Sequence, residues 1–246
     1  GGVGKTTTTI NLAAALSELK KKVLIIDLDP QGNASTGLGV DVEDRELSTY
    51  EFLVEGVPLE KVAMETEISG LSIVPATIDL SSADIDLISN EKRSHLLHEA
   101  LRKKKENKQK YDYILIDCPP SLNILTVNAM VASHSVLIPL QSEFFALEGL
   151  SQLLLTVKEV RQNANENLRV EGIVLTMFDG RNNLSKQVEA DARSNLRELV
   201  FKTIIPRNVR VSEAPSYSMP VLTYDPSSKG SKAYTSLAKE LLANNP

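Results

Sequence analysis

The first seven residues of the chain, GGVGKTT, constrain its fold more than any other segment, because they run directly into an apolar helical stripe. Glycines let successive backbone N–H groups converge on the oxygens of an anion. The Gly-Lys-Thr end adds a cation and a hydroxyl at the start of a helix, where the helix dipole also favours negative charge. A plain glycine turn is the alternative, but this combination predicts a phosphate-binding loop. The residues expected to bind phosphate are Gly1, Gly2, Val3, Gly4, Lys5, Thr6 and Thr7.

Helical and strand-like patterns alternate along the rest of the chain. The apolar spacing predicts a helix over 6–20, and the apolar run 23–28 predicts a buried strand. Such alternation is typical of an α/β fold, a doubly wound and mostly parallel sheet flanked by helices, and with the phosphate-binding loop it predicts the P-loop NTPase type. Further strands are predicted near 71–75, 113–117, 135–140, 170–177 and 200–205.

The composition agrees with one domain over residues 1–246. Hydrophobic residues make up 42% of the chain, whereas aromatic residues make up 4% and tryptophan is absent. The core is therefore built from Leu, Ile, Val and Ala, which suits a parallel sheet covered by helices. Because the chain begins inside the loop, with no strand before it, we expect an N-terminally truncated domain whose central first strand is missing.

Charge and cysteine content exclude several classes of protein. The net charge is −5, so binding to nucleic acid requires a local basic patch. A single cysteine, Cys118, excludes an internal disulfide framework and a Cys/His zinc cluster, which fits a reducing cytoplasm. No run approaches the ~20 apolar residues that span a bilayer, so we expect a cytoplasmic protein without stable membrane insertion.

Acidic residues stand at the ends of two predicted strands. Lys5 can reach the β- and γ-phosphates of a nucleotide, and Thr6 can ligate Mg²⁺. A strand-end carboxylate can fix the same ion directly or through water, which makes Asp117 the second candidate ligand and Asp27 a support. Asp117 could instead cap the helix that follows it, and the DPQG turn at 29–32 could be a solvated β-turn.

Several of these segments resemble one known family. GGVGKTTTTINLAAAL at 1–16 is similar to the deviant Walker A segment of the ParA/MinD family, whose pattern KGGxGKT places a signature lysine before the first glycine. DLDPQGN at 27–33 resembles its Walker A′ segment, and the strand that Asp117 closes resembles its Walker B strand. Residues 140–154 and 175–188 follow the ParA/Soj pattern, so the resemblance covers almost the whole chain.

The resemblance implies an ATPase that converts ATP and water to ADP and phosphate with Mg²⁺. Lys5 and Asp29 are the implied catalytic residues, and Asp29 matches the residue tied to hydrolysis, where a carboxylate near the γ-phosphate positions the attacking water. IIPRNVRVSEAPS at 204–216 looks like a segment that lies against adenine, which makes Pro206 and Asn208 candidate base contacts. A loop followed by a helix cap explains the same two residues.

The ParA/Soj resemblance also implies partners. A sandwich homodimer that forms with MgATP holds double-stranded DNA without sequence preference, and a ParB-like protein stimulates hydrolysis during chromosome or plasmid partition. Such a protein is nucleoid-associated. Dispersed Lys and Arg suffice for contacts to phosphates, although each could be ordinary solvated surface, as we expect of the basic run 102–110. The candidate DNA contacts are Arg181, Lys186, Arg207, Arg210, Lys229 and Lys232.

Two other classes share the loop. A MinD-like ATPase at the cell-division site should end in a basic amphipathic membrane helix, whereas 233–242 is modest in charge and favours a packed terminal helix. A P-loop carrier for metal or cofactor assembly is the second. An iron–sulfur relative would supply cysteines from each subunit, but we expect Cys118 to be structural.

Overall fold

The structure is a computed structural model that describes residues 2–83, 92–102, 110–143 and 146–245. Gly1 and residues 103–109 of the basic run fall outside the described residues, so the predictions for them stay predictions.

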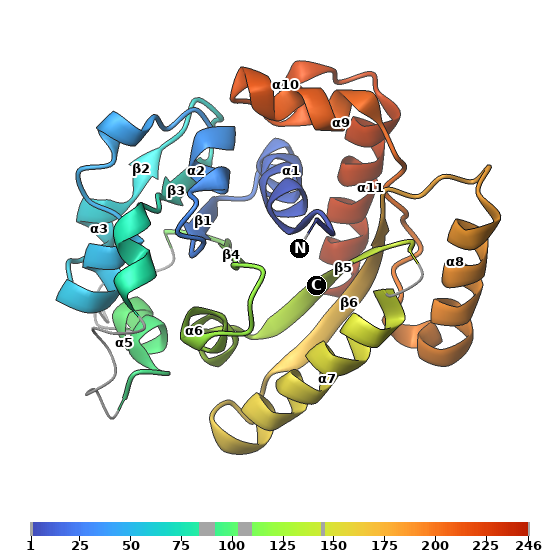
Figure 1. Cartoon of the computed structure of the whole chain (residues 1–246). Coiled ribbons are helices and arrows are strands. Elements are labelled where there is room, and N and C mark those ends of the chain that lie inside the picture. Colours follow the sequence, from blue (N-terminus) through green and yellow to red (C-terminus); the bar gives the residue numbers. More distant parts are fainter. Residues whose placement is uncertain (1, 84–91, 103–109, 144–145, 246) are drawn as a thin grey trace.

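Parallel strands form the centre of the molecule, as predicted, but they lie in two sheets (Figure 1). In the first, β1 (Val23–Asp27) pairs in parallel with β3 (Leu71–Val74) on one side and β4 (Tyr113–Asp117) on the other. In the second, β5 (Ser135–Gln141) pairs in parallel with β6 (Arg169–Thr176). The predicted first strand would precede Gly1 and stays a prediction.

One strand was missed and one was predicted wrongly. β2 (Met64–Glu65) pairs antiparallel with β3 and is too short to give a sequence pattern. The predicted strand 200–205 forms only isolated parallel bridges to the β6 region. The backbone N–H groups of Lys202 and Thr203 donate to the Glu240 carboxylate at 2.7 and 2.9 Å, which pulls the middle of this segment out of the ladder.

Helices cover both faces of the sheets (Figure 1). The longer ones are α1 (Lys5–Glu18), α5 (Leu96–Arg102), α6 (Ile124–Ala132), α7 (Ala146–Asn163), α8 (Asn183–Leu196) and α11 (Lys229–Asn244). The shorter ones are α2 (Asn33–Gly37), α3 (Leu59–Val62), α9 (Val209–Glu213) and α10 (Val221–Tyr224). Short 3-10 helices are η1 (Val42–Asp44), η3 (Ile78–Ser82), η4 (Arg197–Leu199) and η5 (Ala214–Tyr217), and η2 (Glu51–Glu55) is a short π-helix. None of the helices in the described residues is both long and apolar enough to cross a membrane.

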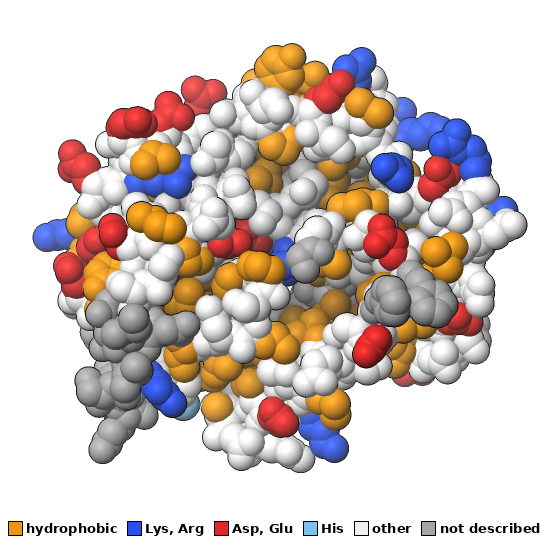
Figure 2. Space-filling view, viewed as in Figure 1, with side chains coloured by type: hydrophobic (Ala, Val, Ile, Leu, Met, Phe, Trp, Pro, Cys, Tyr) orange, Lys and Arg blue, Asp and Glu red, His pale blue; other side chains and the backbone are white. Residues whose placement is uncertain are grey.

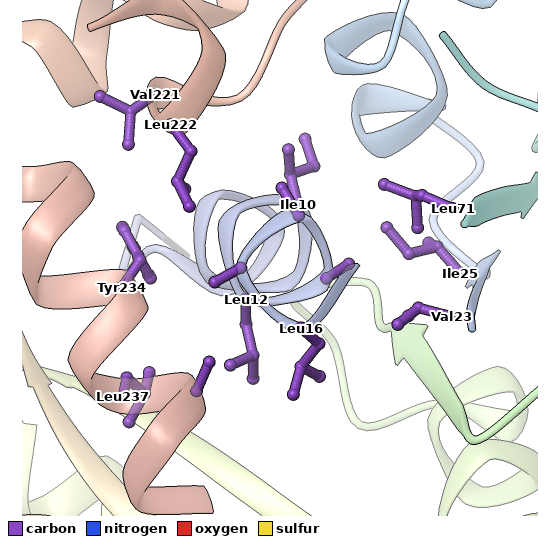
Figure 3. Close-up of a cluster of buried hydrophobic side chains, with 14 of the residues drawn as sticks. Ile10, Leu12, Leu16, Val23, Ile25, Leu71, Val221, Leu222, Tyr234 and Leu237 are labelled. Atoms are coloured by element: carbon purple, nitrogen blue, oxygen red, sulfur yellow. The ribbon is translucent and has the colours of Figure 1, made fainter. Parts of the chain in front are cut away.

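The helix α1 is buried between the sheet and the C-terminal helix. Figure 3 shows α1 between α11, with Tyr234 and Leu237, and the first sheet, with Val23 and Ile25. All four side chains belong to the same buried cluster as Leu16 of α1. Burial on both sides positions α1, because close-packed protein interiors resist small displacements. The loop at the start of α1 is therefore fixed, and the predicted packing of the terminal helix is confirmed.

Candidate functional site

The loop before α1 has the backbone of an anion cradle. Gly2 and Gly4 have φ angles of 83° and 85°, in the left-handed region that favours glycine. No side chain caps the helix at Gly4, and its first turn contains no acidic residue, so its N–H groups are open to an anion. The Thr176 hydroxyl at the end of β6 donates to the Val3 carbonyl at 2.9 Å, which ties the loop to the second sheet.

Thr6 and Asp117 meet at the end of β4. Thr6 Oγ1 donates to Asp117 Oδ2 at 2.7 Å, and Asp117 is 1% exposed. The register of β1 and β4 sets Asp27 directly opposite Asp117, so two carboxylates share one buried strand edge. Burial raises the pKa of Asp117 to about 7, helped by the charges of Asp27 and Asp29, while the Thr6 hydrogen bond and Lys5 act in the opposite direction. The alternative role of Asp117 as a helix cap is wrong, because Asn123 caps α6.

Mg²⁺ fits this donor set. The ion prefers oxygen ligands, keeps several waters and is usually held by one or two carboxylates together with substrate phosphates. Thr6 and Asp117 supply such oxygens beside the loop. The described residues contain no group of three His, Cys, Asp or Glu side chains that could hold a metal by themselves.

Asp27 organises the turn that follows β1. Its Oδ2 accepts hydrogen bonds from the Ser35 N–H at 2.9 Å and the Ser35 hydroxyl at 2.7 Å, and its Oδ1 accepts from the Asp29 N–H at 3.2 Å. Burial raises the pKa of Asp27, whereas the Ser35 hydrogen bonds lower it. Both Asp27 oxygens thus already accept hydrogen bonds from the protein. Asp27 is therefore better placed to support a metal site indirectly than to ligate the metal with both oxygens.

Asp29 lies in a tight turn but is not solvated. Its Oδ1 accepts from the Gln31 N–H at 3.0 Å, and its carbonyl accepts from the Gly32 N–H at 2.9 Å. Asp29 is only 8% exposed and Asp27 is fully buried, so the alternative of a solvated β-turn is wrong.

Sequence reasoning missed Arg45, which lies behind this turn. Its guanidinium is buried and donates to the Ala76 carbonyl at 2.9 Å, the Val40 carbonyl at 2.7 Å and the Thr36 hydroxyl at 2.8 Å. Burial lowers the pKa of Arg45, and the charge of Asp27 opposes that change. No sequence motif indicated this residue, because its acceptors are two nearby polar groups of residues 36–40 and the Ala76 carbonyl, 31 residues along the chain.

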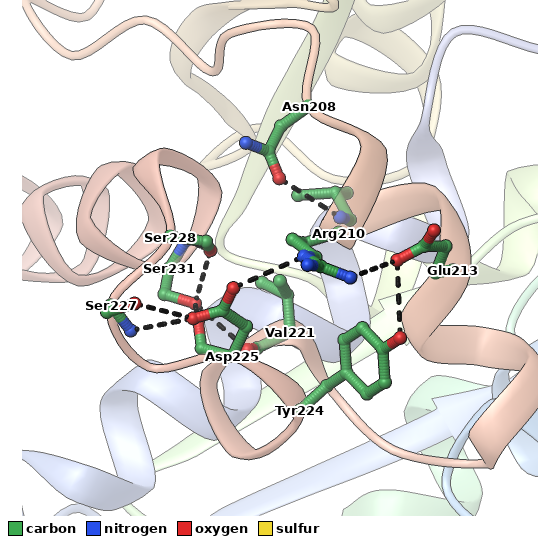
Figure 4. Close-up of polar contacts among 10 residues, drawn as sticks. Asn208, Arg210, Glu213, Val221, Tyr224, Asp225, Ser227, Ser228 and Ser231 are labelled. Atoms are coloured by element: carbon green, nitrogen blue, oxygen red, sulfur yellow. Dashed lines mark hydrogen bonds and ion pairs between the residues drawn. The ribbon is translucent and has the colours of Figure 1, made fainter.

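The candidate base contacts lie beside the end of β6. The Phe178 N–H donates to the Ile205 carbonyl at 3.1 Å, and the Arg207 N–H donates back to the Phe178 carbonyl at 2.9 Å, which holds Pro206 next to Phe178. Asn208 Oδ1 accepts from the Val211 N–H at 3.3 Å and so caps α9 (Figure 4). The expected alternative of a helix cap therefore holds for this oxygen, whereas a role for Asn208 at a base stays a prediction.

The six candidate DNA contacts are all exposed but are not equally free. Arg181 is paired with Asp179 at 2.9 Å. Arg210 is paired with Glu213 at 2.9 Å and with Asp225 at 3.4 Å, as Figure 4 shows. DNA phosphates would have to compete with these carboxylates, so the two arginines are weaker candidates than the lysines.

Lys229 and Lys232 lie together at a groove of about 580 Å³ between α11 and the segment before α9. Lys202, which sequence reasoning did not select, lines the same groove. Figure 2 shows Lys and Arg side chains gathered at the upper right of the molecule, while acidic side chains gather on the upper left. Three lysines thus lie along one groove, whereas their contact with DNA stays a prediction.

Comparison with known proteins identifies the family. A family model described as an AAA domain matches residues 1–170. The chain is 50% identical to the sporulation initiation inhibitor protein Soj of Bacillus subtilis over 244 residues, which are 99% of this chain and 95% of that protein. It is 51% identical to the chromosome partitioning protein ParA of Caulobacter vibrioides over 243 residues, 99% of this chain and 91% of that one. The chain belongs to the ParA/Soj family of P-loop ATPases.

Solved structures agree on the fold of this ParA/Soj protein. A cobyrinic acid a,c-diamide synthase from Mycobacterium smegmatis with bound ADP and magnesium superposes with a TM-score of 0.84 at 36% identity, covering 98% of this chain and 90% of that one. The cell division ATPase MinD of Pyrococcus furiosus gives 0.81 at 28% identity, covering 99% and 94%. The predicted α/β P-loop fold is confirmed.

Proposed function

We propose that this ParA/Soj protein binds and hydrolyses MgATP at the loop, with Thr6 and Asp117 holding the metal ion. The observation that carries the proposal is the 2.7 Å hydrogen bond between these two side chains beside the open N-terminus of α1. Relatives with bound nucleotide and magnesium, such as the synthase from Mycobacterium smegmatis, support the choice of ligand.

Each residue of the site has a separate task in this proposal. Backbone N–H groups from Gly2 to Thr7 cradle the phosphates, and Lys5 places a positive charge where charge develops on the oxygens between the β- and γ-phosphorus atoms. Mg²⁺, when bound, neutralises the same phosphate oxygens. Asp29 orients the attacking water through the carboxylate oxygen that the Gln31 N–H leaves free. Pro206 and Asn208 hold the base.

In the proposal, the protein binds DNA when dimerisation places the lysine-lined grooves of two protomers side by side in one complex. In the proposal, MgATP joins two protomers into a sandwich, which brings two copies of Lys202, Lys229 and Lys232 onto one rigid body. Contacts of this kind need no base recognition, so they suit sequence-independent binding to the nucleoid in the cytoplasm. Hydrolysis, stimulated by a ParB-like protein, returns weakly bound monomers. The family's role in chromosome partition supports this cycle.

Two observations weigh against the other classes. The terminal helix α11 uses Tyr234 and Leu237 to pack against α1, so these apolar side chains are not offered to a membrane. Cys118 is the single cysteine of the chain, whereas an iron–sulfur relative would supply cysteines from each subunit to a shared cluster.

The proposal is tested by following nucleotide, DNA and lipid binding side by side. Calorimetry of the intact protein should detect ATP binding that strengthens with Mg²⁺, and a gel shift with random-sequence DNA should appear only with ATP. Absence of magnesium-dependent ATP binding would contradict the whole proposal. Nucleotide-dependent binding to liposomes without DNA retention would favour the MinD-like class.

A further inference from the structure

Met177, the residue that follows β6, has an unusual combination of backbone and exposure. Its φ angle is 51°, one of three positive φ values among the non-glycine residues that the structure describes. The left-handed region is unfavourable for a residue with a Cβ atom. Its apolar side chain is also 39% exposed. Strained backbone conformations cluster at sites that bind ligands, so the strain and the exposed apolar side chain together suggest a functional role for Met177.

The neighbours of Met177 fix it between two parts of the site. On one side, the Thr176 hydroxyl donates to the Val3 carbonyl of the loop at 2.9 Å. On the other side, the Phe178 N–H and carbonyl pair with the backbone of the segment that carries Pro206. The Met177 methyl group lies 3.6 Å from the point where a side chain at Gly4 would begin. The Met177 side chain therefore lies directly against the phosphate loop.

We propose that Met177 forms a wall of the nucleoside pocket, with its thioether packed against the base of the nucleotide. The inference rests on the proposed function and adds a contact residue to it. Met177 lies between the loop, where the phosphates would bind, and the segment with Pro206 and Asn208, where the base would bind. A nucleotide bound in this way extends over Met177. A polarisable thioether makes favourable contacts with aromatic rings and adapts to their shape. Covering Met177 with a base also removes its exposed apolar surface from water.

Oxidation by hydrogen peroxide can measure whether the nucleotide covers the sulfur. Peroxide transfers one oxygen atom to the thioether, which becomes a sulfoxide, and the remainder leaves as water. The chain has four methionines, and Met177 is the most exposed of them. Peptide mass spectrometry can follow its oxidation rate in the free protein, with MgADP and with magnesium tripolyphosphate. The partly buried Met64 and Met219 serve as internal controls.

We expect saturating MgADP to slow the oxidation of Met177 at least about fivefold and to leave the two control methionines unchanged. Tripolyphosphate fills the loop but has no nucleoside, so it should leave Met177 reactive. If MgADP binds by calorimetry and the rate at Met177 does not change, the inference is wrong while the proposed function stands. Equal protection by tripolyphosphate also contradicts it. Absence of MgADP binding overturns both.

Substitution provides an independent measurement. Met177→Ala should weaken MgADP binding about five- to tenfold and tripolyphosphate binding less than about twofold. Met177→Leu keeps the apolar volume and should retain affinity within about twofold, so it shows whether a loss in the Ala variant comes from the lost apolar volume; the oxidation measurement needs no variant and stands even if the Ala variant folds poorly. Met64→Ala, in the edge strand β2, is the matched control. Equal affinity of the Met177→Ala variant and the parent protein for MgADP would overturn the inference.

Discussion

The hydroxyl of Thr6 donates a 2.7 Å hydrogen bond to Oδ2 of Asp117 across a sequence separation of 111 residues. The bond joins the first turn of α1 to the last residue of β4. It arranges two oxygen atoms beside the phosphate loop before any ligand arrives. Preorganisation of this kind matters because metal sites lose affinity when their ligands must be reoriented on binding.

Replacing Thr6 should separate metal-dependent from metal-independent nucleotide binding. Thr6→Ala removes one candidate Mg²⁺ ligand, so we expect MgATP affinity to fall about 10- to 100-fold, with little change for ATP in EDTA. Thr6→Ser keeps the hydroxyl and should bind within about threefold of the parent protein, since the ligand oxygen is retained. Calorimetry with and without Mg²⁺ checks both variants. An equal loss in the presence and absence of Mg²⁺ would show that Thr6 does not act through the metal.

Asp117 should make the metal-free protein less stable as the pH rises. Its pKa is raised from 3.8 to about 7 in the folded state, so between these values the folded protein binds more protons than the unfolded chain. Stability therefore falls as pH increases through this window, by an amount on the order of 2 to 4 kcal/mol. Urea unfolding in EDTA between about pH 4.5 and 7.5 measures the slope.

The variant Asp117→Asn cannot titrate and should lose most of this pH dependence, and it should be more stable than the parent at neutral pH without metal. A smaller slope of the same sign should remain, because burial also raises the pKa of Asp27. Identical slopes in the two proteins would mean that Asp117 is not the titrating group.

Asp29→Ala should separate nucleotide binding from turnover. The carboxylate is buried beside the site and acts in our proposal only on the attacking water, so we expect ATP affinity to stay within about threefold while turnover falls about 100-fold or more. The variant should then remain on DNA in the presence of ATP. Phosphate release and DNA retention measure the two effects, with the exposed Asp191→Ala as the control. Retained turnover would remove Asp29 from the mechanism.

DNA binding should depend on salt and on the lysines of the groove. If each protomer neutralises ~2 phosphates, a fourfold increase in salt weakens the monomer roughly 12-fold and the dimer roughly 150-fold. Replacing Lys229 and Lys232 together by Ala should flatten the salt dependence and weaken all DNA sequences alike. Lys158→Ala, on the exposed face of α7, should change neither. An unchanged salt slope in the double variant would place the DNA face elsewhere.

Local sequence patterns were enough to predict the elements that carry the phosphate site. The loop, α1, β1 and β4 depend on glycine chemistry and on apolar periodicity within short segments, and each lies within a few residues of its predicted bounds. The convergence of Asp27 and Asp117 followed from a general property of parallel sheets, whose strands end at a common edge.

Long-range contacts explain what the sequence could not predict. The segment 200–205 has a strand-like composition. However, two of its N–H groups donate hydrogen bonds to the carboxylate of Glu240, far along the chain, instead of to a neighbouring strand. Lys202 lies in this segment and lines the basic groove. Met177, whose backbone is left-handed, likewise lies between residues that contact distant segments, and nothing in the neighbouring sequence indicates its conformation.

Arg45 provides the sharpest test of how the turn after β1 is held. Replacing it by Met removes the donors for the Val40 and Ala76 carbonyls and the Thr36 hydroxyl, while filling most of the space. Since buried acceptors without partners are costly, we expect unfolding free energy to fall by about 2 to 4 kcal/mol. Turnover should fall with it, because the guanidinium lies behind the turn that carries Asp29, the carboxylate that we propose orients the attacking water. Arg161→Met, on an exposed face of α7, should change stability by less than about 0.5 kcal/mol. Urea unfolding compares the two, and equal stabilities would show that the hydrogen bonds of Arg45 contribute nothing net to holding the turn.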